Sequence, residues 1–188
     1  MDEPFLMRVE DVFRRGQGRV VMLTGRIERG RVRKGDEVEI VGYGGGAIVP
    51  VEGIEEGCGR HAGEASAGMN VGLLLPGVVA GAAERGQVLA APGSITAHTG
   101  FEAAIVLLSE EQGSAAVHTG DRLQFHIRTA VLPGVVALSQ ATNVLQPLHM
   151  GVVTVAFERP VAIEEGQSFA FRHHGRAAGS GTVTRLPH

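Results

Sequence analysis

The sequence predicts an all-β fold of two consecutive small antiparallel β-barrels. Apolar segments of strand length recur at close spacing, and glycine, proline or charged turns separate them. Long runs with apolar residues at a helical period are missing from the 188 residues. Glycine is abundant at 28 residues while aromatic residues make up only 4%, which suits many tight turns between strands and aliphatic cores.

The first half of the chain holds the segments that we expect to form the first barrel. Gly25–Val32 should contain strands joined by a charged hairpin bounded by glycines, and Arg33–Asp36 should form a second turn. The expected strands are Phe5–Val9, Arg19–Arg26, Glu37–Val41, Ala47–Val51 and Asn70–Leu75.

The segment Ala90–Ser94 is the expected boundary between the two barrels, because it is rich in small residues and carries a Pro-Gly turn near mid-chain. We therefore expect one domain over residues 1–90 and a second over residues 91–188. Closing each sheet would remove edges that are open to aggregation. The expected strands of the second barrel are Phe101–Leu108, Arg122–Thr129, Val135–Leu138, Val152–Phe157, Ser168–Arg172 and Gly181–Leu186.

Composition limits the function classes. Hydrophobic residues make up 44%, enough for packed cores, and the net charge of −3 gives no global attraction to nucleic acid, so RNA binding would need a local basic patch. The single cysteine, Cys58, excludes an intramolecular disulfide and fits a reducing compartment. No charged-then-apolar leader opens the chain, and its apolar runs fall far short of about 18 residues. We expect a cytoplasmic protein with no membrane partner.

Several segments resemble the second and third domains of the elongation factor Tu family, in the same order. The resemblance covers nearly the whole chain from about Pro4, and it implies a translation-related binding protein built of the family's two β-barrels without its GTPase domain. The matching segments are Pro4–Phe13, Thr24–Gly30, Asn70–Leu75, Glu84–Ala90, His98–Glu102, Gln124–Thr129, Pro160–Ala162 and Gly175–Arg176.

No segment has the pattern of a nucleotide-hydrolysing site. A phosphate-binding loop requires Gly-x-x-x-x-Gly-Lys-Ser/Thr, so that backbone amides and one lysine surround the phosphates. The sole lysine, Lys34, lies between two expected strands, and Gly16–Gly18 is too short and precedes no helix. We expect no enzyme activity, no catalytic residue and no cofactor.

The resemblance implies a pocket on the first barrel for the aminoacyl end of a charged tRNA. A terminal adenosine splayed from its stack needs an apolar or stacking surface, and polar groups that read its edges and hydroxyls. The alternative is that barrel folding alone retains these residues, with Phe13 in the core and the acidic residues in turns. The positions that match the family pocket are Glu10, Asp11, Phe13, Thr24, Glu55 and Asn70.

Three further residues match family positions that face the body of the tRNA. Arg85 matches an arginine near the 5′ end, Arg159 replaces a lysine facing the T stem, and Gln124 is kept there. Guanidinium groups suit phosphate, and each contact adds salt-dependent affinity. A tRNA interface would then be a basic groove with Arg26, Arg60, Arg85 and Arg159, whereas a solvated arginine in a turn is the alternative for Arg85.

The second barrel departs from the family where the family grips the T stem. Pro133 replaces a threonine near the expected Leu132–Gly134 turn, and proline has neither a hydroxyl nor an amide hydrogen to donate. His173 and His174 replace a Glu-Gly pair after Arg172. They could add positive charge at mildly acidic pH, but they would not reproduce the original contacts.

The cysteine and histidines do not form a recognisable metal motif. Zinc sites usually show paired ligands such as C-x₂-C with H-x₃₋₅-H. Cys58–His61 has ligand types at close spacing, and only folding could bring His173 and His174 near it. We expect no metal, and a surface thiol at Cys58.

Three functions remain open from the sequence. The first is a module that binds the acceptor end of aminoacyl-tRNA without a GTP switch. The second is a decoy or regulatory module that binds no tRNA and presents a Tu-like surface to a factor or inhibitor that normally targets elongation factor Tu, such as a translation factor or a GTPase partner. The changes at Pro133, His173 and His174 favour this function. The third is a fragment or decayed copy without a separate function. The oligomeric state stays open.

Overall fold

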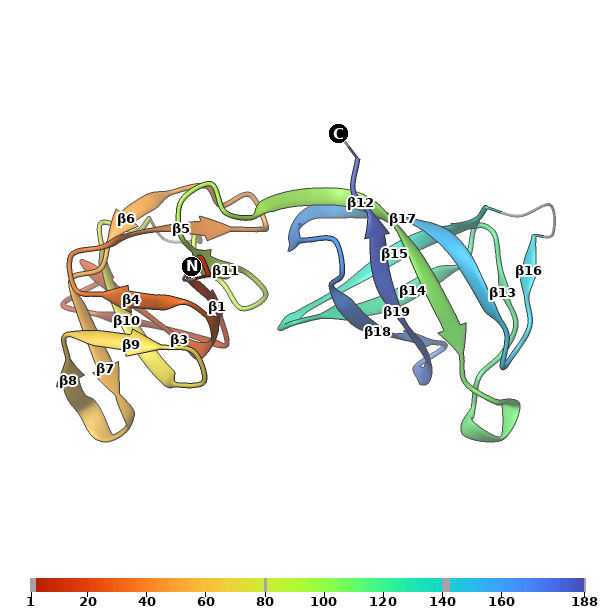
Figure 1. The fold of residues 1–188 in the computed structure, drawn as a ribbon, viewed down its shortest axis with the longest axis horizontal. Helices are drawn as coiled ribbons and strands as arrows, with labels where there is room; N and C mark the ends of the chain where they lie inside the picture. Colours follow the sequence, from red (N-terminus) through yellow and green to blue (C-terminus); the bar gives the residue numbers. More distant parts are fainter. Residues whose placement is uncertain (1–2, 80, 140–142, 188) are drawn as a thin grey trace. The chain divides into compact units, whose positions relative to one another are not determined.

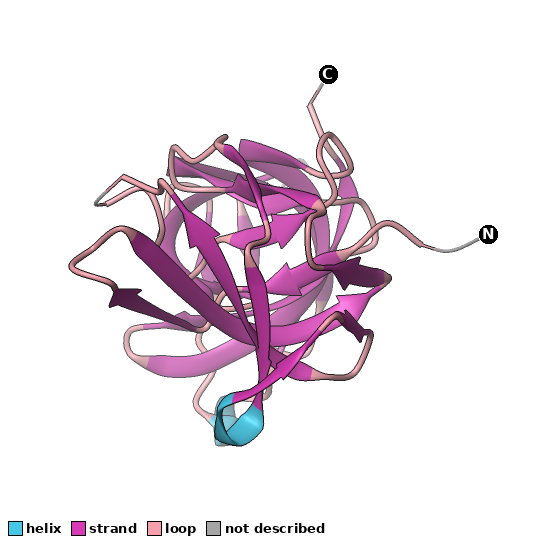
Figure 2. Ribbon diagram, turned by 90° about the vertical axis from the view of Figure 1, so that its left-hand side faces the viewer, coloured by secondary structure: helices cyan, strands magenta, loops and turns pink. Residues whose placement is uncertain are grey.

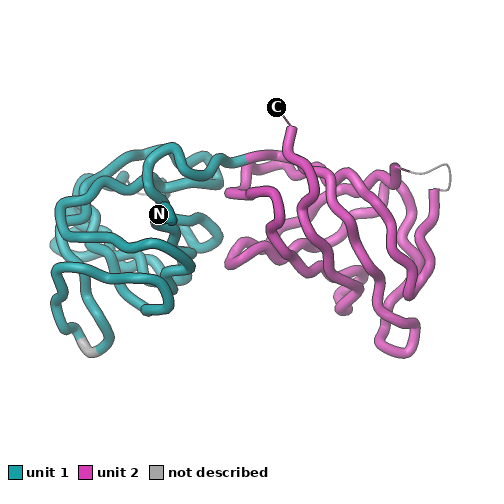
Figure 3. Tube along the Cα trace, in the orientation of Figure 1, with its two compact units in different colours: residues 1–97 teal, residues 98–188 magenta. Residues whose placement is uncertain are grey.

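The computed structural model describes residues 3–79, 81–139 and 143–187, apart from the side chain of Cys58, and it confirms the all-β class. The chain divides into two compact units, Met1–Ala97 and His98–His188 (Figure 3). Figure 2 shows that strands make up almost all of the regular structure. Short 3₁₀ turns interrupt them at Gly57–Gly59 (η1) and Glu110–Gln112 (η2).

The first unit is built on one strongly curled antiparallel sheet. Its order is β6-β5-β11-β1-β3-β10-β7-β8, with β2 paired to β3 beside this path, and β4 and β9 form a separate ribbon. The chain itself joins the ends of the curl, because Val51 and Glu52 link β6 to β7, and the Glu52 amide donates to the Leu74 carbonyl of β10 (2.8 Å). The strands are β1 (Leu6–Arg8), β2 (Asp11–Arg15), β3 (Val20–Arg29), β4 (Arg31–Arg33), β5 (Glu37–Val41), β6 (Ile48–Pro50), β7 (Gly53–Glu56), β8 (Arg60–Ala62), β9 (Glu64–Ser66), β10 (Asn70–Pro76) and β11 (Val88–Ala90) (Figure 1).

Alternation along the strands separates an aliphatic core from an outer face. Leu23, Leu73 and Ile54 lie directly opposite one another on β3, β10 and β7, and each is fully buried. Burying a side chain of this size stabilises the fold by about 1.5–3 kcal/mol. Because successive residues of a strand point to opposite faces, the next row, Thr24, Gly72 and Glu55, points outward.

The second unit is a closed barrel in the order β12-β17-β15-β14-β18-β19, with β13 and β16 paired beside it. Phenylalanines fill its centre, and the ring of Phe125 lies 5.5–6.4 Å from the rings of four others, Phe101, Phe157, Phe169 and Phe171. The strands are β12 (Thr96–Leu107), β13 (Val117–His118), β14 (Arg122–Ile127), β15 (Ala130–Leu138), β16 (Val144–Leu145), β17 (Met150–Ile163), β18 (Ser168–His173) and β19 (Arg176–Arg185).

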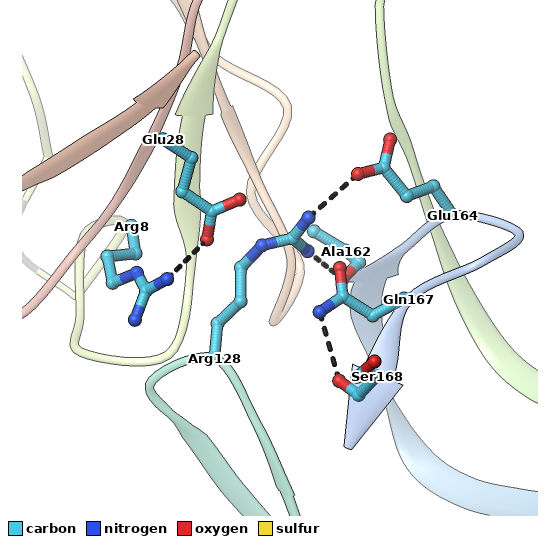
Figure 4. A network of polar contacts seen from close by, with 7 residues as sticks. All are labelled: Arg8, Glu28, Arg128, Ala162, Glu164, Gln167 and Ser168. Atoms are coloured by element: carbon cyan, nitrogen blue, oxygen red, sulfur yellow. Dashed lines mark hydrogen bonds and ion pairs between the residues drawn. The ribbon is translucent and has the colours of Figure 1, made fainter. Parts of the chain in front are cut away.

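Two arginine pairs stabilise strand ends within the units (Figure 4). In the first unit Arg8 donates to Glu28 (2.9 Å). In the second, the Arg128 side chain is only 3% exposed and donates to the Glu164 carboxylate (2.9 Å) and to the Ala162 carbonyl (3.4 Å). The second pair ties the turn between β14 and β15 to the end of β17.

Two expected turns are wrong. Strand β3 continues through Gly25 to Arg29, and Arg31–Arg33 pairs with β9 instead of folding back on β3. Leu132–Gly134 lies inside β15, and the chain reverses earlier, at Arg128, whose φ is +53°. Arg33–Asp36 does form a turn, in which the Asp36 amide donates to the Arg33 carbonyl (3.0 Å).

Candidate functional site

A pocket of about 370 Å³ opens on the outer face of β3, β10 and β7. Four residues predicted from the sequence line it, namely Glu10, Thr24, Glu55 and Asn70. Gly72 lies directly opposite Thr24 on one side and Glu55 on the other, so these three residues share one row of the outer face. Three strands that are far apart in the sequence, β3, β10 and β7, thus meet at the pocket.

Glycines allow close packing around this pocket. A Cβ atom at Gly72 would lie 2.7 Å from the sulfur of Met22, which also lines the pocket. A Cβ atom at Gly25 would collide with the backbone carbonyl oxygen of Arg8, where the chain crosses β3 on its way from β1 to β2. Gly57 and Gly59 of η1 complete the lining. Glycine at positions 25 and 72 therefore allows the Arg8 carbonyl and the Met22 side chain to pack closely beside the pocket.

The hydrogen bonds of the corner between β1 and β2 hold Glu10 at the pocket. The Glu10 amide donates to the Thr24 carbonyl (2.8 Å), and the Val9 amide donates to the Gln87 carbonyl (3.0 Å). Arg85 donates from Nη1 to the Glu10 carbonyl (3.1 Å). Arg85, which the sequence predicts as a tRNA contact, therefore binds the same corner, although its side chain does not line the pocket.

Gln87 fixes the loop that carries Arg85. Its side chain is buried, its Oε1 accepts from the Glu84 amide (2.7 Å), and its Nε2 donates to the carbonyls of Gly42 (2.9 Å) and Ala82 (3.1 Å). A buried amide with both ends satisfied specifies one loop conformation. Arg85 is thus presented by an ordered loop.

The pocket contains one cation among carboxylates. Glu10, Glu55 and Glu56 line it together with Arg15 of β2. The Arg15 guanidinium forms an ion pair with the Glu55 carboxylate (2.5 Å), and the two side chains are 48% and 11% exposed. The lining carries a net negative charge, so it favours a neutral or cationic group over a bare phosphate at its centre.

Asp11 and Phe13 lie beside the pocket without lining it. Asp11 is opposite Thr24 and Phe13 is opposite Met22, so both point to the same outer face. Phe13 is 49% exposed, so the alternative that placed it in the core is wrong. The alternative that placed the acidic residues in turns is also wrong for Asp11 and Glu55, which lie in β2 and β7.

Eight further residues line the pocket and were not predicted as site residues, namely Arg15, Met22, Gly25, Glu56, Gly57, Gly59, Val71 and Gly72. Some of them could have been predicted from the two-residue period of a strand, because residues two apart share a face. Arg15 lies two residues after Phe13, and Gly72 lies two after Asn70, so each shares a face with a predicted residue. Of the expected basic groove, Arg26 is exposed opposite Asn70 and Arg60 is exposed opposite Glu56.

On the second unit the predicted tRNA contacts lie on separate strands. Gln124 of β14 is exposed, opposite Pro133 on β15 and Arg172 on β18, and Arg159 is exposed on β17. The outward residues of β15 are all apolar, namely Val131, Pro133, Val135 and Ala137. A strip of this kind offers no hydrogen-bond donor to a phosphate backbone.

His173 departs from its expected role as a source of charge. It is buried, its ring stacks on His174 with 3.9 Å between centroids, and its Nδ1 has no hydrogen-bond partner among the described residues. Burial, and then His174, lower the pKa of His173 below its ordinary value, against the raising effect of Asp121, whose carboxylate lies 3.8 Å from Nε2. His173 is therefore harder to protonate than an ordinary histidine, whereas His174 is exposed.

Among the described residues, no group of three His, Cys, Asp or Glu side chains is placed to hold a metal ion. The expectation for the thiol of Cys58 falls on a side chain outside the described part of the structure. No helix in the described ranges has the length and apolar character that crossing a bilayer requires.

Fold and pocket together define a class: a tandem β-barrel protein with a small outer pocket on its first barrel. Family models match both barrels, elongation factor Tu domain 2 over residues 20–90 and the elongation factor Tu C-terminal domain over residues 94–187. The chain therefore belongs to the elongation factor Tu family, through these two domains, neither of which is the GTPase domain.

Proposed function

We propose that the first barrel holds the aminoacylated 3′ end of a tRNA, and that the chain is a cytoplasmic Tu-like binding protein without enzyme activity. The observation that supports this best is the pocket, which gathers Glu10, Thr24, Glu55 and Asn70 from distant parts of the sequence. Its volume of about 370 Å³ falls within the range of roughly 300–1,000 Å³ for small-ligand sites.

The chemistry of the lining fits a nucleoside ester. Met22 and Val71 offer apolar surface for a base, Thr24 and Asn70 offer neutral hydrogen-bonding groups, and the carboxylates suit hydroxyls and an ammonium group. Asp11, Phe13 and Arg85 border this pocket, and in the proposal they extend it toward the acceptor stem. Gln124 and Arg159 of the second barrel contact the tRNA body.

The test is binding of aminoacylated and deacylated tRNA to the purified chain across a salt series. We expect preference for the aminoacylated form, and we expect Asn70→Ala to weaken binding by about tenfold, as for loss of a buried hydrogen bond at an interface. Gln146→Ala is the matched control, because Gln146 is an exposed amide on the second unit. No binding at low salt would end the tRNA proposal.

The apolar strip on β15 supports a second candidate, a module that docks a protein instead of tRNA. Val131 and Val135 are 48% and 44% exposed, with Pro133 between them. Exposed apolar surface of this kind is typical of protein contacts. Sedimentation of the chain with a family GTPase domain added in trans tests this candidate. If both proteins sediment as separate monomers at all concentrations, the result contradicts it.

A further inference from the structure

Arg15 is the feature of the pocket that the proposed function leaves unexplained. Its guanidinium spans the outer face from β2 to the Glu55 carboxylate on β7, although β3 and β10 lie between these strands. It is the one cation among the residues that line the pocket. A ligand that enters must either pass beside this ion pair or exchange with it.

The exposure of the pair favours exchange. The Arg15 side chain is 48% exposed while that of Glu55 is 11% exposed, so the guanidinium reaches solvent and the carboxylate is held in the wall. An ion pair this exposed is weak, because water and side-chain entropy offset most of its attraction. The pair has one contact, from Arg15 Nη1 to Glu55 Oε1, whereas a phosphate can accept two hydrogen bonds from a guanidinium and carries greater charge.

The position of Arg15 indicates which part of a nucleotide it would meet. Arg15 is the last residue of β2, next to the hairpin Gly16–Gly18, and the exposed Arg14 and Arg19 flank the same hairpin. Glu10, Glu55 and Glu56 make the rest of the pocket acidic, which disfavours phosphate there. A phosphate can therefore enter favourably only at the hairpin end.

We propose, on the basis of the proposed function, that Arg15 leaves Glu55 and binds the 5′-phosphate of the adenosine whose nucleoside occupies the pocket. Arg15 then selects a nucleotide over a nucleoside and sets its direction, with the phosphate at the β2–β3 hairpin and the base and ribose among Met22, Thr24 and Asn70. The Glu55 carboxylate, released from Arg15, becomes available to a ligand hydroxyl.

The test compares adenosine with adenosine 5′-monophosphate (AMP) as probes, by calorimetry or ligand-observed NMR on the whole chain. We expect AMP to bind about tenfold more tightly than adenosine at low salt, as for a charge-assisted bidentate contact, and the preference to shrink as salt rises. Arg15→Gln should abolish the preference, measured as the ratio of the AMP and adenosine affinities of that same variant. Glu55→Gln should increase the preference, because it removes the competing carboxylate.

Arg14→Gln is the matched control. Arg14 is the preceding residue of the same strand, so it points to the opposite face, and its Nη2 lies 3.5 Å from the Val79 carbonyl. This variant should keep the AMP preference. Equal loss in Arg14→Gln and Arg15→Gln would reduce the effect to general charge and overturn the inference.

The remaining outcomes separate the inference from the proposed function. Equal binding of adenosine and AMP to the unaltered chain overturns the role of Arg15 and leaves the nucleoside pocket intact. Binding of neither probe overturns the pocket itself. A short RNA ending in CCA should bind at least as tightly as AMP, and weaker binding of that RNA would identify a free-nucleotide site and contradict the tRNA proposal.

Discussion

On the first barrel, the outer face of β3, β10 and β7 is hollowed into a pocket, and charged residues are part of its lining. On the second barrel, the outer face of β15 is a continuous row of Val131, Pro133, Val135 and other apolar residues. The family relationship covers both barrels. The outward side chains of the strands therefore differ in chemistry between the two barrels, while the inward side chains form a buried core in each.

The cores of the barrels differ as well. The first is mainly aliphatic, with Leu23, Leu73 and Ile54 in one fully buried row and Phe5 as a buried aromatic residue. The second is centred on five phenylalanine rings. Large planar rings lose many contacts when one is removed, so the second core should depend more on single residues than the first.

Phe125→Ala should give the largest loss of stability. Phe125 is fully buried and contacts four other rings, so the substitution leaves a cavity and should lower the free energy of unfolding by about 3–5 kcal/mol. Urea unfolding followed by circular dichroism measures it. Phe13→Ala is the control, because Phe13 is half exposed, and an equal loss there would contradict its outward position.

Gly25→Ala should follow, with a loss of about 2–4 kcal/mol, because the added methyl group meets the Arg8 carbonyl and the backbone must shift. Binding at the pocket should fall with it. Gly57→Ala is the matched control, since Gly57 also lines the pocket but has open space around its Cβ position. Stability of Gly25→Ala equal to that of Gly57→Ala would show that β1 and β3 do not approach as described.

The fold class and part of the pocket were predictable from the sequence. Turn residues and period-two alternation predicted the all-β fold, and family motifs predicted Glu10, Thr24, Glu55 and Asn70, which do meet in one pocket. Arg85 was identified, but its bond to the Glu10 carbonyl depends on how Gln87 folds the loop, which no local pattern encodes. The domain boundary between residues 90 and 91 stays a prediction. The contacts of the predicted site residues with tRNA also stay predictions.

The failures have physical causes. A charged Gly-bounded segment favours a hairpin locally, yet β3 runs on through Gly25 because tertiary pairing with β1 and β10 outweighs that preference. Pro133 suggested a turn, but it lies within β15 at an outward position. The Arg15–Glu55 pair joins residues 40 positions apart, which only the folded sheet brings together.

Acidification should destabilise the chain through His173. Burial lowers the folded-state pKa of His173, so the unfolded state binds its proton first as the pH falls below about 6.5. Stability from this group is full above that pH and is lost as the pH falls toward the lowered folded pKa. Urea midpoints at pH 7.5 and 5.5 measure the change, and His173→Leu should reduce the difference. His149→Asn, at an exposed site, should not.

Val135→Lys should have the smallest effect on stability, within about 0.5 kcal/mol, because Val135 is 44% exposed and points outward. Its value lies in separating the two candidate functions of the second barrel. If the tRNA backbone passes over β15, the added charge should tighten binding and steepen its salt dependence by about one unit. If a protein docks on the strip, the lysine should abolish that contact and leave tRNA binding unchanged.

Val106→Lys, at a 39% exposed valine on β12, controls for the added charge alone. Identical behaviour of the two variants would show that β15 takes part in neither function.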